Sequence, residues 1–412
     1  MLKNIINKRQ GITLIALVVT IIVLLILAGV SISMLTGQNG ILNRTQEAKE
    51  KTETAQEDEN QKLQGYEDII NQYSGNLPTR EETKPYFPDS TFSYKEGDLS
   101  KGLVIKDANN NEYVWVEVPR TIYDNATYNN SGANRPENAD DWEKIKNCLK
   151  AYTVDYSSSS YGDTNKDGTT YSNDYKNMLK SVYTNGGFWI GRYEAGLEEG
   201  KSPRTSYVAL ENSDKAVIKP NMYPYNYVTR DEAQIIATRM NYGDCTSSLI
   251  FGIQWDLVLK YIETKFVEKN ASSDIKMKLT SNSTTIGNYY NSEFTLNRGK
   301  FAQYNALSNW YNFNSEKKTE LVTESKKKEQ SLYSNAILLT TGATEATNLQ
   351  NIYDIAGNVW ELTREIYITN NNCIYRGGSY DGNGSSIHAQ YRNYNDTSYN
   401  DYHVGFRVGL WK

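Results

Sequence analysis

The sequence predicts an α+β protein in which one long N-terminal helix precedes a folded domain with much irregular structure. Two observations lead to this prediction. An apolar run without charge covers residues 12–35, and beyond residue 100 short segments rich in β-branched and aromatic residues alternate with stretches of Asn, Gly and Pro. At 412 residues and 38% hydrophobic content, the chain can bury one large core or two smaller ones.

The apolar run predicts a membrane helix. It extends from Ile12 to Leu35, which at ~1.5 Å per residue is enough to cross a hydrocarbon core of ~30 Å. Lys3, Lys8 and Arg9 precede it, so the positive-inside rule leaves the N-terminus in the cytoplasm and the rest of the chain outside the cell. A secretory signal peptide is the alternative, but the run is longer than the usual apolar region of about 7–15 residues. We therefore expect a single-pass protein of the cell membrane.

The same region resembles the leader and first helix of type IV prepilins, with a short basic leader, a glycine and then an apolar helix. The resemblance implies that residues 1–11 are a leader, and that a prepilin peptidase cleaves after Gly11 and methylates Ile12. The fifth mature residue of pilins is usually Glu, but here it is Ala16. That difference favours a minor or tip subunit over a major one, with other pilins as partners if the chain enters a filament.

Residues 36–75 predict a solvated stalk that continues the helix, so that the membrane and stalk helix covers residues 12–75. Charges of both signs are interleaved, and Glu47 with Lys51 forms a favourable i,i+4 pair. A coiled coil is the alternative, but no apolar heptad repeats. Pro78, Pro85 and Pro88 then predict an extended linker over residues 76–100, and a domain over residues 101–412.

Within the domain, strands are expected over residues 103–107, 112–119 and 186–196, with few helices. Thr229 and Glu232 form a capping box that predicts a helix after residue 229, and a second helix is expected over residues 253–267. No repeat of 20–50 residues is evident.

Composition narrows the function. The net charge of −5 and the lack of a long basic run argue against nucleic acid as a partner. Tyrosine outnumbers phenylalanine by 33 to 9, which indicates a binding surface, because Tyr tolerates water and offers contact area at low entropic cost. Cys148, Cys245 and Cys373 form no metal-binding pattern and allow at most one disulfide.

Three C-terminal motifs, "YDIAGNVWELTRE", "YRGGSY" and "VGFRVGL", resemble the end of the formylglycine-generating enzyme (sulfatase-modifying factor) family. The resemblance extends to "YVWVEVP", "FWIGRYEAG" and "VTRDEA" upstream, and it implies a C-type lectin-like fold over residues 101–412. In the enzymes, two cysteines between the second and third motifs bind copper and carry the oxidation. Their positions fall on Gly382 and Ile387, so no copper and no oxidase activity are expected. The related sulfoxide synthases need a histidine cluster, whereas this chain has only His388 and His403.

Two calcium sites are predicted. The first is implied by the family resemblance, and consists of Asp354, Gly357, Val359 and Glu361, where two carboxylates flank two backbone carbonyls. The alternative is that Trp360 is core and the acids cap the turn. The second, weaker site is a loop with the spacing of a calcium-binding loop, formed by Asp163, Asn165, Asp167 and Asp174 around Gly168.

Between Arg376 and Val408 the sequence is dominated by Tyr, Asn, Asp, Ser, Gly and His, the adaptable residues that binding surfaces favour. This pattern resembles the variable proteins of diversity-generating retroelements, which keep RGGS-like and GFRV-like scaffold pieces. The expected function is therefore adhesin-like binding of a surface protein or glycan. An enzyme with an unrecognised centre and a purely structural minor pilin are the alternatives. The candidate ligand-binding residues are Tyr380, Asp381, Asn383, Ser385, Ser386, His388, Tyr391, Asn393, Tyr394 and Asn395.

Overall fold

The structure is a computed structural model. It describes residues 17–27, 48–49, 51–52, 55–56, 77–78, 80–163, 168–269, 274–304, 306–315 and 336–412, and the side chains of these except 168–171. The chain divides into two compact units, Met1–Ile70 and Asn71–Lys412. The second unit is a mixed α+β domain.

In the first unit, residues 17–27 are helical and their apolar side chains are exposed. Residues 48–49, 51–52 and 55–56 are also helical, as the stalk prediction requires of them. Within the described part of the chain, no helix combines the length and the apolar character needed to span a bilayer. Gly11, Ile12 and the remainder of the predicted membrane and stalk helix lie outside the described residues.

An antiparallel sheet runs through the domain in the order β1-β2-β3-β5-β16-β8. Its strands are β1 (Ser93–Glu96), β2 (Val104–Lys106), β3 (Glu112–Glu117), β5 (Gly187–Gly191), β16 (Val408–Trp411) and β8 (Thr246–Leu249). The predicted strands over 103–107, 112–119 and 186–196 are confirmed by β2, β3 and β5. β16 lies between β5 and β8, which places the C-terminal strand inside the sheet.

A second sheet carries the C-terminal segment, in the order β14-β13-β12-β15. Its strands are β12 (Trp360–Tyr367), β13 (Cys373–Arg376), β14 (Arg392–Asn395) and β15 (Val404–Phe406), and β4 (Tyr161–Gly162) pairs with the far end of β12. β15 is parallel to β12, and the other pairs are antiparallel. β14 therefore lies at an edge of this sheet.

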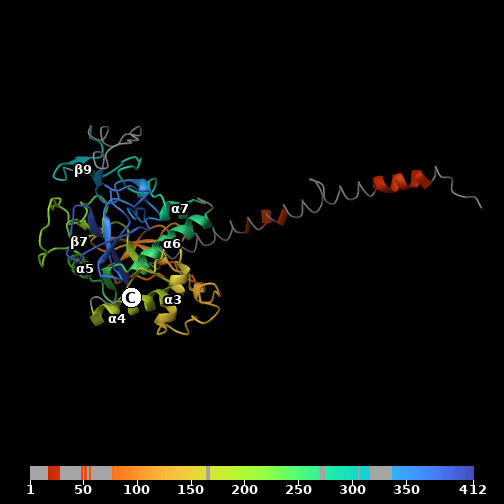
Figure 1. Cartoon of the computed structure of the whole chain (residues 1–412), viewed down its shortest axis with the longest axis horizontal. Helices are drawn as coiled ribbons and strands as arrows, with labels where there is room; N and C mark the ends of the chain where they lie inside the picture. Colours follow the sequence, from red (N-terminus) through yellow and green to blue (C-terminus); the bar gives the residue numbers. More distant parts are fainter. Residues whose placement is uncertain are drawn as a thin grey trace, which may run out of the picture. The chain divides into compact units, whose positions relative to one another are not determined.

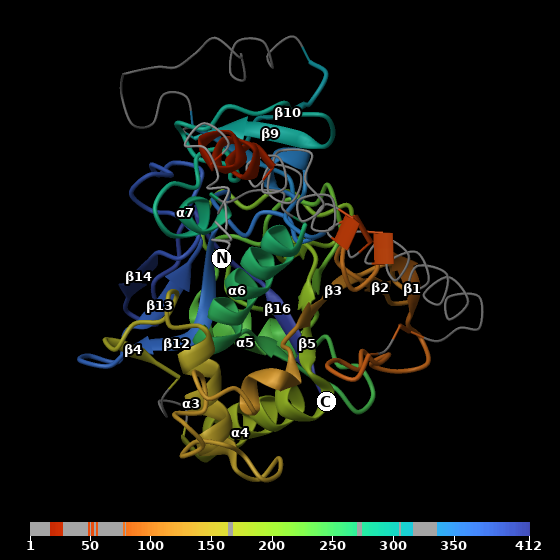
Figure 2. The same ribbon diagram turned by 90° about the vertical axis from the view of Figure 1, so that its right-hand side faces the viewer.

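Two smaller sheets complete the strands. One has the order β10-β9-β11, formed by Trp310–Asn312, Lys300–Gln303 and Ile337–Leu339, and the other pairs β6 (Gly196–Leu197) with β7 (Ala216–Val217). β9 lies at the opposite end of the domain from helices α3 (Trp142–Tyr152) and α4 (Gly168–Asn185) (Figures 1 and 2). Short 3-10 turns cover Arg120–Tyr123 and Glu345–Thr347.

Both predicted helices are confirmed. The capping box at Thr229 is complete, because its side chain accepts from the backbone of Glu232 while the Glu232 side chain accepts from the backbone of Thr229, and α5 (Arg230–Thr238) follows. α6 (Gly252–Glu268) covers the second prediction and lies in the middle of the domain (Figure 2). α7 (Ile275–Thr280) adds a short helix after it.

Helices α3 and α4 were not expected from the sequence. α4 contains many Thr, Ser, Asn and Tyr residues, which are indifferent helix formers. Its inward face is nevertheless apolar at helical spacing, where Tyr175, Met178, Leu179 and Val182 are all buried in the core. Packing of this face stabilises a helix that local propensity does not predict.

The linker predicted over residues 76–100 is wrong, because this segment is packed into the domain. Leu77, Phe92 and Leu99 are buried, and the Oγ1 of Thr83 accepts a hydrogen bond of 2.7 Å from the indole of Trp115. The prolines exclude a helix here, but they do not prevent an extended chain from covering a sheet. The domain therefore begins before residue 101.

The central strands of the first sheet, β3, β5 and β16, are buried on both faces. Along β3, Val114 and Val116 join the core cluster that includes α3, α4 and α6, while Tyr113 and Trp115 join the cluster that includes α5. Helices thus cover both sides of the sheet, and the second sheet is held against this rigid body.

Candidate functional site

The predicted ligand-binding segment consists of a loop, residues 377–391, followed by β14 and the chain leading to β15. The loop begins with Gly377 and Gly378, whose φ angles are +89° and +82°. A β-carbon at position 378 would lie 2.3 Å from the carbonyl oxygen of Ile387. Only glycine adopts this turn without strain. The turn brings the backbone at position 378 against the backbone of Ile387, later in the same loop.

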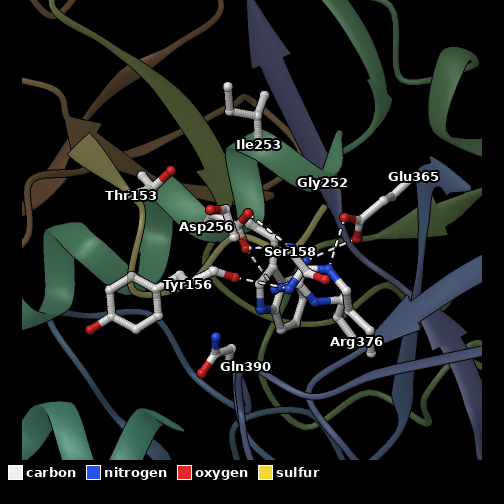
Figure 3. Close-up of polar contacts among 12 residues, drawn as sticks. Thr153, Tyr156, Ser158, Gly252, Ile253, Asp256, Glu365, Arg376 and Gln390 are labelled. Atoms are coloured by element: carbon white, nitrogen blue, oxygen red, sulfur yellow. Dashed lines mark hydrogen bonds and ion pairs between the residues drawn. The ribbon is translucent and has the colours of Figure 1, made fainter. Parts of the chain in front are cut away.

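Two arginines close the base of this loop. Arg376 ends β13, Arg392 begins β14, and the two are cross-strand partners. Both contact the same two carboxylates, Asp256 of α6 and Glu365 of β12. Arg376 lies 2.7 Å from Asp256 and 3.0 Å from Glu365 (Figure 3), and Arg392 lies 2.8 Å from each. We call these four residues the arginine clamp.

The arginine clamp is buried, so its charges depend on one another. Burial raises the pKa of Asp256, an effect that Arg392 and Arg376 oppose. Burial alone would also raise the pKa of Glu365, but the two guanidinium groups outweigh it and hold that pKa below its ordinary value. Removing one member would leave a buried charge without its partner, which is strongly destabilising.

The clamp also ties the loop to the segment after α3. Arg392 donates a 2.9 Å hydrogen bond to the carbonyl oxygen of Tyr156, and Gln390 donates one of 2.9 Å to that of Asp155. Figure 3 shows Tyr156 and Gln390 beside the ion pairs. The loop is therefore fixed from α6, from β12 and from this segment.

Gly382 and Ile387, the positions where the family carries copper-binding cysteines, lie in contact. A β-carbon at position 382 would be 1.8 Å from Cδ1 of Ile387. Ile387 is partly buried and packs against both large core clusters. The two positions to which the family resemblance assigns copper-binding cysteines therefore form an apolar contact in this chain.

The three cysteines of the chain lie elsewhere. Cys148, Cys245 and Cys373 are all buried, and none of the three forms a disulfide bond. Burial raises the pKa of Cys148 to about 11 and that of Cys245 to about 12, so both are protonated thiols near neutral pH. They have the properties of core residues.

Two of the predicted ligand-binding residues are not on the surface, which corrects the sequence prediction. Tyr380 is fully buried and packs with Ala302, Leu338 and Val359. Asp381 is also buried, and its carboxylate accepts from Ser379, Tyr402 and His403 at 2.5, 2.9 and 3.0 Å. The turn at the paired glycines directs these two residues inward, which their polar character alone does not indicate.

Four predicted residues lie at the outer part of the loop. Ser385 and Ser386 are exposed, and Asn383 and His388 are half-buried. The Asn383 amide donates to the hydroxyl of Tyr290 at 2.9 Å and accepts from the backbone of Ser385 at 2.9 Å, so it holds the loop in place. Burial lowers the pKa of His388, which favours the neutral imidazole. The exposed serines are the members of this group that remain open to a ligand.

The remaining four predicted residues lie on or next to β14 and are divided between the two faces of that strand. Alternation places Tyr391, Asn393 and Asn395 on the face of Tyr375, the cross-strand partner of Asn393. Tyr394 lies on the opposite face, where its ring stacks on Tyr367 at 4.7 Å. The structure therefore does not bring all the predicted residues into one surface.

Sequence reasoning missed Tyr399 and His403, which extend the first face. Tyr399 stacks on Tyr375 with centroids 6.0 Å apart, and its hydroxyl lies 3.2 Å from Nε2 of His403. Nδ1 of His403 is 3.0 Å from Asp381, so the buried carboxylate orients the imidazole. The strand period could have identified Tyr391, Asn393 and Asn395, but only the tertiary contacts add the other two. We call these five residues, Tyr391, Asn393, Asn395, Tyr399 and His403, the tyrosine face.

The first predicted calcium site lies in a buried charged cluster. Asp354 accepts from the backbone of Gly342 and from Thr347, both at 2.7 Å, and Glu361 accepts from Arg407 at 2.5–3.0 Å. Gly357 adopts φ +74°, and the backbone of Val359 donates to a third buried acid, Glu194, at 3.1 Å.

Burial raises the pKa of Asp354, Glu361 and Glu194, and the positive charge of Arg407 only partly opposes this effect. Their oxygens are already hydrogen-bonded to protein donors, so a calcium ion bound as in the enzymes would have to displace Arg407 from Glu361. Among the residues that the structure describes, no three His, Cys, Asp or Glu side chains are placed to hold a metal ion together. Calcium at this position stays a prediction.

The second predicted calcium site is divided in the structure. Asp163 accepts from the backbone amides of Gly252 and Ile253 at 2.7 and 3.0 Å and so caps α6. Asp174 pairs with Arg364 at 2.8 Å. Burial, with a contribution from Glu365, raises the pKa of Asp163 to about 7. Asn165 and Asp167 lie outside the described residues.

Residues 273–410 match the family of sulfatase-modifying factor enzyme 1-like domains. The crystal structure of CarF is similar to the chain at a TM-score of 0.31 and 12% identity, over 55% of this chain and 87% of CarF. Treponema denticola variable protein 1 is similar at a TM-score of 0.26 and 13% identity, over 55% of this chain and 85% of that protein. No curated protein sequence matches the chain.

Proposed function

We propose that the chain is a non-catalytic, adhesin-like protein of the cell surface that binds its ligand through the tyrosine face and the exposed serines of the adjoining loop. The observation that carries the proposal is the rigid support of this surface. The buried arginine clamp closes the base of the loop, while Tyr391 above it is 38% exposed. Rigid aromatic side chains with adaptable polar neighbours bind at low entropic cost.

The absence of the sulfur pair supports binding over oxidation. Gly382 and Ile387 fill the position with an apolar contact, and neither can coordinate copper. The purified protein is therefore expected to bind no Cu(I) tightly and to leave the cysteine of a sulfatase peptide unchanged. Conversion of that cysteine to formylglycine would establish the enzyme instead.

Display on a pilin-like helix is the second part of the proposal. It is supported by the helical stretch at residues 17–27, which is apolar except for Thr20 and whose Leu24, Leu25 and Ile26 are 60–67% exposed. A helix with apolar side chains on every side needs lipid or neighbouring helices around it. Such an anchor holds the domain outside the cell, in the membrane or as a minor subunit of a filament.

Diversification by a retroelement is the third part. Asn codons mutated at adenine yield Tyr, Asp, Ser, His, Gly and Ile, which are the residue types found between Gly378 and Val404. Burial of Arg407 and Phe406 supports a fixed scaffold around exposed, changeable positions. The neighbouring DNA should contain a reverse transcriptase gene and a near-copy of the 3′ end that differs only at adenines. Without both, the surface is invariant.

The binding proposal is tested with glycan arrays and arrays of purified bacterial surface proteins. The full chain is compared with a Tyr391→Ala/Asn393→Ala/Tyr399→Ala variant. A control variant carries Tyr207→Ala and Val208→Ala, two exposed residues outside the C-terminal segment. At least one probe should bind the wild type and the control, and bind the face variant at least about tenfold more weakly. Equal binding of a probe to the wild type and to the face variant, or no binding of any probe, contradicts the proposal.

A further inference from the structure

A cavity of about 460 Å³ opens between α3, α4 and β4. Its volume is within the range of about 300–1,000 Å³ that small-molecule sites occupy. Aromatic and apolar side chains form much of its wall, namely Trp142, Tyr161, Tyr175 and Ile368. None of these residues belongs to the tyrosine face.

Two lysines flank the indole ring of the cavity. Lys146 follows Trp142 by one turn of α3, and Lys176 approaches from α4. Their ammonium groups lie 5.1 and 4.7 Å from the centroid of the Trp142 ring. Lys150, one further turn along α3, also lines the cavity. Three lysine side chains from two helices thus line this cavity, in a chain whose net charge is negative.

These lysines form no ion pair with any residue that the structure describes, whereas their neighbours do. Lys144 lies 3.3 Å from Asp141, and Lys180 lies 2.6 Å from Asp140. Lys146 and Lys176 approach the same indole ring, so an anion bound beside them would offset the repulsion between their charges. Within the described part of the chain, the helices therefore present ion-paired lysines outside the cavity and lysines without an ion pair at it.

The remaining polar groups of the cavity suit an anion. Hydroxyl groups come from Ser158, Ser159 and Ser172. The carboxylate of Asp163 also lines the cavity, but both of its oxygens accept from the N-terminal amides of α6. Both oxygens are thus engaged by the helix N-terminus rather than by the lysines.

We propose that this cavity binds a small organic anion with a planar or apolar body. The carboxylate or phosphate group contacts the ammonium groups of Lys146 and Lys176, and the body lies against Tyr161 and Tyr175. The site is independent of the tyrosine face. It is nevertheless connected to β14, because the ring of Tyr161 lies 5.4 Å from Tyr367, on which Tyr394 stacks.

Calorimetric titration of the full chain tests the site with three probes. Phthalate carries two carboxylates on an aromatic ring, inorganic phosphate carries charge without a ring, and benzyl alcohol carries a ring without charge. Phthalate should bind at least about tenfold more tightly than either other probe, and a Lys146→Met/Lys176→Met variant should lose at least about tenfold in affinity. The matched control, Lys144→Met/Lys180→Met, removes two lysines that do not line the cavity and should bind like the wild type.

Each other outcome overturns the proposal. Equal affinity for phosphate and phthalate would indicate an adventitious ion only. Equal affinity for benzyl alcohol would indicate an apolar cavity without preference for anions. Phthalate binding that survives the Lys146→Met/Lys176→Met change, in a protein whose melting temperature is unaltered, would place the anion elsewhere, and no phthalate binding would leave the lysines without a ligand.

Discussion

The identities of Gly382 and Ile387 determine whether this loop can coordinate copper, because neither side chain offers a ligand atom. The two residues are in contact. They are identified in the sequence by their spacing from the glycine turn, and the structure shows that they are also neighbours in space. What the sequence could not indicate is that Ile387 occupies the room that a side chain at position 382 would need. The side chain of Ile387 therefore fills the space beside position 382.

Gly382→Ala is expected to destabilise the domain by about 1–3 kcal/mol, because the added methyl overlaps the side chain of Ile387. In the double variant Gly382→Ala/Ile387→Ala the overlap disappears. The free energy of unfolding of the double variant should therefore exceed, by about 1 kcal/mol or more, the value expected if the two single changes were additive. Urea unfolding of the four proteins measures this coupling, and strictly additive changes would show that the two side chains do not meet.

A second residue-scale prediction concerns Asp381. Burial by itself would raise its pKa, but hydrogen bonds from His403, Ser379 and Tyr402 outweigh burial and lower the pKa below its ordinary value. The ionised carboxylate therefore stabilises the fold above the unfolded-state pKa of 3.8, and this contribution is lost as the pH falls through the folded-state value.

Asp381→Asn should thus cost about 1–3 kcal/mol at pH 7, and the difference from wild type should shrink as the pH falls to 3 and below. Urea unfolding at several pH values provides the measurement. Asp396→Asn, a change at an exposed carboxylate of the same segment, is the control and should have a small effect. A cost that is the same at pH 3 and pH 7 would show that ionisation of Asp381 does not matter.

At the scale of elements, the arginine clamp joins three strands to a helix that lies about a hundred residues earlier in the sequence. Asp256 comes from α6, Glu365 from β12 and the arginines from β13 and β14. The exposed Ser385 and Ser386 are not among the residues that form the clamp. This arrangement lets the outer residues change without loss of the loop's position.

Arg392→Met is expected to destabilise the domain by about 3–5 kcal/mol, because it leaves buried carboxylates short of a partner. Amide hydrogen exchange in residues 377–391 should rise with it. Arg392→Lys keeps the charge but not the paired geometry, so its effect should be intermediate and should remain measurable if the methionine variant fails to fold. Asn393→Ala, at the next residue, should cost less than about 1 kcal/mol. Equal effects at the two positions would contradict a clamp.

At the scale of the whole molecule, the calcium prediction can be tested by melting. A ligand that binds only the folded state adds about 2.7 kcal/mol at a hundredfold excess over its Kd. If calcium binds at Asp354 and Glu361, EDTA should lower the melting temperature, and Asp354→Asn should remove that difference. A melting curve that EDTA does not move would leave Arg407 as the partner of these acids.

Processing of the N-terminus is the other whole-molecule prediction. The basic leader and the Gly11–Ile12 junction predict cleavage and methylation, so mass spectrometry of the mature protein should find N-methylated Ile12. Replacement of Gly11 by Trp should block the cut, while Gln10→Ala should leave it intact. An N-terminus at Met1, or one beyond Leu35, would rule out the pilin-like anchor.

The sequence by itself determined the features that depend on local patterns. These include the capping box at Thr229, the helix at residues 253–267, the early strands and the glycine turn after Arg376, because side-chain period and turn chemistry act over a few residues. The absence of cysteine at positions 382 and 387 is also a local fact, which the sequence shows directly.

Only the tertiary structure decided which polar residues face solvent. Tyr380 and Asp381 have the composition of a binding surface, yet the chain reversal and the partners His403 and Tyr402 place them inside. Strand alternation put Tyr394 on one face and Asn393 on the other, and α3 and α4 formed because their apolar faces found a core. Burial, register and packing depend on residues distant in the chain, so neighbouring letters do not reveal them.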